Sequence, residues 1–132
     1  MNQEKRLELL EKNLEELSIL SSDHIIIVEG PKDKEALSYL GICGDMIAVQ
    51  SEGGPLRVSE TICAAGKNAV ILTDWDHKGD VIADELKRNL SAMCVHFDTQ
   101  IRARLKDVCV KDIKDVESLP ALYRRLSSTK EE

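Results

Sequence analysis

Four short apolar runs, separated by segments with helical periodicity, constrain this chain more than any other feature of its sequence. The first run, Ile-Ile-Ile-Val, is entirely β-branched and apolar, which is typical of a strand buried on both faces of a parallel sheet. Strand and helix alternate along the chain, and this order predicts a parallel α/β sheet with right-handed crossovers. The predicted strands cover residues 25–28, 46–49, 69–73 and 93–97.

The segments between and around these strands predict the helices. Pro31 suits the first turn of a helix, and Gly66 suits a helix end. We expect helices over residues 4–20, 31–40, 56–65 and 79–90, and one or two more within 98–132. The predicted organisation is therefore a single α/β domain over residues 23–126, an amphipathic helix within residues 1–22, and a frayed tail over residues 127–132.

The N-terminal helix carries a leucine stripe. Leu7, Leu10, Leu14 and Leu17 recur at spacings of three and four, with Glu and Lys between them. Such a stripe needs an apolar partner. It either docks on the core of its own domain or forms a short seam in a homodimer, and two heptads are short for a coiled coil.

Composition excludes several classes of protein. With 42% apolar and 32% charged residues, the chain has neither a disordered nor a membrane-spanning composition. Its start, Met-Asn-Gln-Glu-Lys-Arg, does not resemble a secretory signal, so we expect a cytoplasmic protein without membrane contact. The four cysteines form no Cys-x-x-Cys pair, and we expect free, buried thiols rather than zinc ligands or disulfides.

Acidic residues follow two of the predicted strands. Glu29 closes the first strand, and Asp74 and Asp76 close the third. Sites of open parallel sheets form beyond the carboxyl ends of the strands, so the three carboxylates converge if these strands are neighbours. Clustered carboxylates repel one another and need a compensating proton or cation. Oxygen ligands of this kind suit Mg²⁺, with Mn²⁺ as a substitute.

The net charge of −6 weighs against nucleic-acid binding, because such proteins are more often basic. The acidic excess lies mainly in residues 23–97, which carry seven basic and twelve acidic side chains. A divalent cation bound there offsets part of it.

Two motifs resemble those of the Toprim family, which occurs in bacterial primases, topoisomerases, the 5S ribosomal RNA maturase and OLD nucleases. Residues 26–33 read Ile-Ile-Val-Glu-Gly-x-x-Asp, and residues 70–79 read Val-Ile-Leu-Thr-Asp-Trp-Asp-x-x-Gly. The resemblance covers about residues 24–97. It implies a three-layer, Rossmann-like sheet of about four parallel strands with added N- and C-terminal helices.

The resemblance also implies roles. Glu29 matches the acid or base that handles the proton at the reacting oxygen, and Asp74 and Asp76 match the metal ligands. Where topoisomerases add a third acid, this chain has Lys78, which favours the primase and maturase type over a two-metal mechanism. The remaining candidates for contact with phosphate or nucleic acid are Gly30, Lys32, Asp33, Lys78 and Gly79.

Three functions remain open from the sequence. The first is Mg²⁺-dependent phosphoryl transfer on nucleic acid, as a nuclease acting on RNA rather than DNA, with a partner protein supplying specificity. The second is a non-catalytic nucleic-acid adaptor of the same fold. The third is a phosphate-handling α/β domain of another class, such as a receiver domain or a dehalogenase-type phosphatase. Asp33 is equally explained as a helix cap, and Trp75 either as a packing anchor or as a platform for a base.

Overall fold

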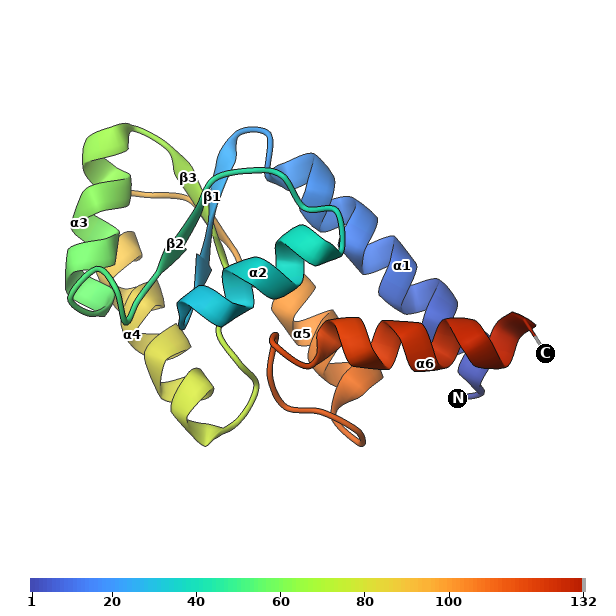
Figure 1. Ribbon diagram of the computed structural model, residues 1–132. Coiled ribbons are helices and arrows are strands. Elements are labelled where there is room, and N and C mark those ends of the chain that lie inside the picture. Colours follow the sequence, from blue (N-terminus) through green and yellow to red (C-terminus); the bar gives the residue numbers. More distant parts are fainter. Residues whose placement is uncertain (132) are drawn as a thin grey trace.

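A computed structural model describes the backbone of residues 1–131 and the side chains of residues 1–128. Helices and strands alternate as the sequence predicts, and two helices follow the last strand (Figure 1). The elements are α1 (Gln3–Leu20), β1 (His24–Val28), α2 (Pro31–Tyr39), β2 (Met46–Ala48), α3 (Pro55–Ala65), β3 (Asn68–Ile71), α4 (His77–Ala92), β4 (Phe97–Asp98), α5 (Gln100–Cys109) and α6 (Leu119–Glu131).

The four strands form one parallel sheet in the order β2-β1-β3-β4. Ile27 of β1 pairs with Ile47 of β2 on one side and with Ile71 of β3 on the other. The chain runs outward from β1 to β2 and then crosses back to β3, so the strand order reverses between β1 and β3. Ligand sites of open α/β sheets lie at such a reversal, beyond the carboxyl ends of the strands.

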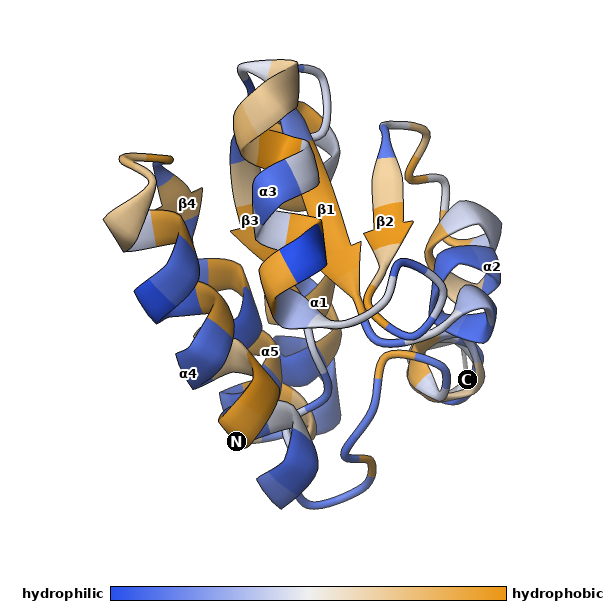
Figure 2. Ribbon diagram, turned by 90° about the vertical axis from the view of Figure 1, so that its left-hand side faces the viewer, coloured by the Kyte–Doolittle hydropathy of each residue, from blue (hydrophilic) through white to orange (hydrophobic). Residues whose placement is uncertain are grey.

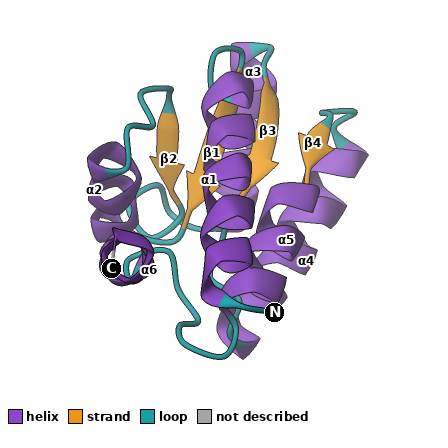
Figure 3. Cartoon of the chain, turned by 90° about the vertical axis from the view of Figure 1, so that its right-hand side faces the viewer, coloured by secondary structure: helices purple, strands orange, loops and turns teal. Residues whose placement is uncertain are grey.

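The sheet is buried on both faces, because alternate residues of each strand point to opposite sides. Ile26 and Val28 join one apolar cluster, whereas Ile25 and Ile27 join another. The first cluster contains residues of α1, α2, α5 and α6, and the second contains residues of α3 and α4. Figures 2 and 3 show these two helical layers from opposite sides with the strands between them, and the colours of Figure 2 mark the strands as largely apolar. The predicted three-layer α/β fold is confirmed.

The leucine stripe of α1 docks on its own domain. Leu7, Leu10, Leu14 and Leu17 are all buried, and α1 packs against α5 and α6. Arg6 also pairs with Asp112, beyond the end of α5. The four leucines therefore find their apolar partner within the domain, as the first of the two predicted alternatives has it.

The fourth strand was predicted too early and too long. Helix α4 continues to Ala92, and Cys94 then adopts a left-handed conformation with φ of 58°. The amide of Val95 closes this turn by donating to the carbonyl of Leu90, so only residues 97 and 98 pair with β3. The apolar run over residues 93–97 is thus divided between a helix end and a two-residue strand.

One further expectation needs correction. The cysteines are not uniformly buried, since Cys43, Cys63 and Cys94 are exposed and Cys109 alone is buried among the four. Helix α6 extends to Glu131, and Glu132, the last residue of the tail predicted to fray, lies outside the described residues. Across the part of the chain that the structure describes, the helices are too short or too polar to cross a membrane.

Candidate functional site

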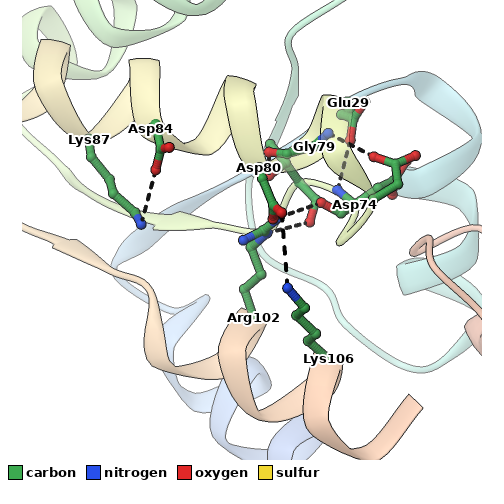
Figure 4. A network of polar contacts seen from close by, with 10 residues as sticks. Glu29, Asp74, Gly79, Asp80, Asp84, Lys87, Arg102 and Lys106 are labelled. Carbon is green, nitrogen blue, oxygen red and sulfur yellow. Dashed lines mark hydrogen bonds and ion pairs between the residues drawn. The ribbon is translucent and has the colours of Figure 1, made fainter. Parts of the chain in front are cut away.

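The two acidic motifs meet at the carboxyl ends of β1 and β3. Glu29 directly follows β1, and its side chain is 5% exposed. Its carboxylate accepts a hydrogen bond from the amide of Asp74, with 2.8 Å between Oε2 and N (Figure 4). The first motif therefore fixes the backbone of the second, and the sequence prediction that Glu29 and Asp74 lie together is borne out by this contact.

Asp74 lies between Glu29 and a loop from the C-terminal part of the chain. Its Oδ1 accepts a hydrogen bond of 3.0 Å from the amide of Val116. Burial raises the pKa of Asp74 to about 7, and the negative charges of Glu29 and Asp33 and a hydrogen bond to Glu29 add to this rise. Two carboxyl groups this close do not both ionise easily without a compensating positive charge.

Asp76 is the N-cap of α4. Its Oδ1 accepts a hydrogen bond of 2.7 Å from the amide of Gly79, which is the usual geometry of a capping aspartate. Gly79 has no room for a side chain, because a Cβ atom there would lie 1.8 Å from the carbonyl oxygen of Asp74. The space that a side chain at position 79 would need is therefore filled by the backbone of Asp74.

Asp33 and Gly30 form the corresponding turn at the start of α2. The Asp33 carboxylate accepts a hydrogen bond of 3.0 Å from the amide of Gly30, so the capping interpretation of Asp33 is confirmed. Burial raises the pKa of Asp33, and the charge of Glu29 raises it further. A Cβ atom on Gly30 would meet the Gln50 side-chain oxygen at 2.8 Å, and the exposed Gln50 side chain would have to move to make room for it.

A cavity of about 600 Å³ opens over these turns. Of the residues predicted to hold the metal or to contact phosphate, all line this cavity except Gly79, which is buried. Lys32 and Lys78 are exposed at this cavity. Its lining residues are Glu29, Gly30, Pro31, Lys32, Asp33, Glu35, Gln50, Asp74, Asp76, Lys78 and Glu117.

The C-terminal part of the chain supports the second motif, and the sequence alone does not predict this support. Trp75 is buried, its indole N–H donates to the carbonyl of Ile113, and its amide donates to the carbonyl of Lys114. Trp75 is therefore a packing anchor, and the interpretation of Trp75 as a platform for a base is wrong. The same loop places Glu117 in the cavity.

Arg102 of α5 also supports the second motif, and the sequence alone does not predict this role either. Its guanidinium donates to the carbonyl oxygens of Thr73 and Asp74 and to the carboxylate of Asp80. A partly buried arginine has no local sequence signature, and the contact spans 28 residues from Asp74, so only the tertiary structure reveals it.

Comparison with known proteins agrees with this geometry. The Toprim domain profile matches residues 24–108, which include both motifs and Arg102. The chain belongs to the Toprim family. This membership, and the position of the aspartate pair after β3 rather than β1, favour a Toprim domain over a receiver domain or a dehalogenase-type phosphatase.

Two similar proteins are UPF0292 proteins of Methanosarcina species. The one from Methanosarcina barkeri is 41% identical over 92% of this chain and 85% of its own length, and the one from Methanosarcina acetivorans is 38% identical over 94% and 86%. A solved structure of a protein from Aquifex aeolicus superposes with a TM-score of 0.71 at 28% identity, covering 83% of this chain and 97% of that one. The likeness thus reaches beyond the segment that carries the two motifs.

Toprim domains typically bind Mg²⁺, and the donor set here fits such an ion. Carboxylate side chains line the cavity, and carboxylate oxygens are ligands that Mg²⁺ prefers. Burial and the neighbouring charge of Glu29 raise the pKa of Asp74. A bound cation would relieve the repulsion between these two carboxyl groups, as a proton does. Among the side chains of residues 1–128, however, no three His, Cys, Asp or Glu residues already form a closed metal cluster. The carboxylates instead accept hydrogen bonds from backbone amides.

Proposed function

We propose that this Toprim domain catalyses Mg²⁺-dependent phosphoryl transfer on nucleic acid, as a nuclease that acts on RNA in preference to DNA. The observation that carries the proposal is the contact between Glu29 and Asp74, which unites the acids of both motifs at one end of the sheet. The preference for RNA rests on the motif likeness to the 5S ribosomal RNA maturase. Mn²⁺ is the expected substitute ion.

In this proposal Asp74 and Asp76 hold the metal, and Glu29 completes the site and handles the proton at the reacting oxygen. Bound Mg²⁺ supplies Lewis acidity at a phosphate oxygen. Glu29 is suited to its role because it is buried beside Asp74 while still lining the cavity. Lys32 and Lys78 are exposed at the same cavity and can contact phosphate as point charges.

The test is a cleavage assay on end-labelled structured RNA and on DNA of the same sequence, with Mg²⁺, Mn²⁺ or EDTA. Asp76→Asn should lower the rate at least about a hundredfold, because a metal contributes several kcal/mol to stabilising the transition state. Asp84→Asn is the matched control. Asp84 lies on the exposed face of the same helix and pairs with Lys87, away from the cavity, so this variant should cleave like the wild type.

A second candidate is a non-catalytic adaptor that binds nucleic acid. The observation that favours it is that each motif carboxylate already accepts a backbone amide, so these acids are also explained as supports of the loops. In that case no substrate is cut with either metal, and Asp76→Asn binds RNA as tightly as the wild type. Metal-dependent cutting that Asp76→Asn abolishes and Asp84→Asn retains would reject the adaptor.

A further inference from the structure

Arg102 joins three acceptors around the second motif (Figure 4). Its Nε lies 2.9 Å from the carbonyl oxygen of Thr73, and one terminal nitrogen lies 2.5 Å from that of Asp74 and 2.6 Å from Oδ1 of Asp80. The arginine side chain is 11% exposed. Both carbonyl oxygens belong to the segment that leads from β3 into the loop with Asp74 and Asp76, so Arg102 fixes the backbone from which the two aspartates project.

The charge of Arg102 is matched within this contact. Asp80 pairs with it, and the hydrogen bond from Arg102 lowers the pKa of Asp80. Lys106, one turn later on α5, lies 4.0 Å from the other oxygen of Asp80. Arg102 does not line the cavity, and it therefore acts on the site through the backbone that it holds rather than by touching a substrate.

The three supports of Asp74 come from different parts of the chain. Glu29 of the first motif binds its amide, Val116 binds its carboxylate, and Arg102 binds its carbonyl oxygen. The backbone of Asp74 is thus held at both its donor and its acceptor. Residues that orient metal ligands in this way typically change metal affinity ten- to a hundredfold when they are replaced.

We propose that Arg102 is a positioning residue for the metal site, which sets the direction of Asp74 and Asp76 by clamping the carbonyl oxygens of Thr73 and Asp74 against Asp80. The inference rests on the proposed function, since it concerns the same ligands. It assigns this role to the shape of the guanidinium, in which Nε and a terminal nitrogen donate from separate, fixed positions in one plane, whereas a lysine ammonium donates from a single atom. A lysine at this position keeps the charge but loses the fork.

The test measures Mn²⁺ affinity rather than activity. The single tryptophan of the chain, Trp75, lies between Asp74 and Asp76 and is buried, so its fluorescence reports on the loop. Titration of the wild type with Mn²⁺, followed by Trp75 fluorescence and by calorimetry, gives the reference Kd. We expect Arg102→Lys to weaken this Kd about tenfold to a hundredfold. Arg102→Lys should also shift the Trp75 emission of the metal-free protein.

The matched control is Arg104→Ala on the same helix. Arg104 is half-exposed, pairs with Glu16 of α1 and does not touch the loop, so this variant should keep the wild-type Kd. Circular dichroism establishes that each variant is folded at the titration temperature. Arg102→Ala, which removes all three contacts, can be measured beside Arg102→Lys. If Arg102→Ala fails to fold, Arg102→Lys still decides the question.

The possible outcomes separate the inference from the function on which it rests. A wild type that binds Mn²⁺ and an Arg102→Lys variant with the same Kd would overturn the role of Arg102 and leave the proposed function intact. A folded wild type that binds neither Mn²⁺ nor Mg²⁺ would overturn the proposed function, and with it the positioning role. Weaker binding in Arg102→Lys and unchanged binding in Arg104→Ala would support both.

Discussion

Replacing Gly79 by alanine provides the sharpest test of how tightly the second motif is packed. Gly79 lies in the first turn of α4, and the new Cβ atom would stand 1.8 Å from the carbonyl oxygen of Asp74, 2.5 Å from its carbonyl carbon and 3.1 Å from its Cα. Ordinary contact begins near 3.4 Å. The obstacle is backbone rather than a flexible side chain, and the same carbonyl oxygen is held by Arg102. Moving this loop to make room for the new Cβ atom would therefore cost free energy of folding.

Two opposing contributions determine the size of the effect. Alanine in place of glycine stabilises a helix by up to about 1 kcal/mol. Overpacking costs about 1–3 kcal/mol, and the direct conflict with backbone places this site near the upper end. The net loss in the free energy of unfolding is therefore about 2 kcal/mol. For a domain of this size that corresponds to a melting temperature lower by about 8 °C.

The assay is urea unfolding of Gly79→Ala, followed by Trp75 fluorescence and circular dichroism, beside Glu85→Ala. Glu85 is exposed on the same helix, so its replacement should change the free energy of unfolding by less than about 0.5 kcal/mol. A Gly79→Ala protein as stable as the wild type, or more stable, would refute the reasoning. Helix propensity would then outweigh the clash, and the carbonyl of Asp74 would have to lie elsewhere.

Two further predictions concern titration and thiol reactivity. Because the pKa of Asp74 is raised to about 7 in the folded protein, the folded state binds more protons than the unfolded state above the ordinary value near 3.8. The melting temperature in EDTA should therefore fall as pH rises from 5 to 8, and Asp74→Asn should flatten this slope, whereas an equal slope in both proteins would contradict the assignment. Burial raises the pKa of the Cys109 thiol to about 11, so at pH 8 Ellman's reagent should label the three exposed cysteines quickly and Cys109 only after unfolding, as mass spectrometry of each thiol can check.

The sequence by itself determined the layers of the fold and predicted which acids gather at the carboxyl ends of the strands. Apolar runs of strand length alternate with helical periodicity, and this order permits few topologies other than a parallel α/β sheet. Glu29, Asp74 and Asp76 could be named in advance, because they follow predicted strands and because strand ends are where sites of such sheets form. The leucine stripe on α1 likewise predicted an apolar partner, although not which one.

Only the tertiary structure decided how those acids are held and where elements end. Arg102 and the loop that contains Ile113 and Val116 reach the second motif from 28 to 42 residues away, and contacts at that separation leave no local pattern in a sequence. The end of α4 was missed for a related reason. An apolar run suits a helix end as well as a strand, and the left-handed turn at Cys94 decided between them. Hydrophobic periodicity in the sequence indicates which face of a helix or strand is buried, whereas the packing of the folded chain determines which other elements cover that face.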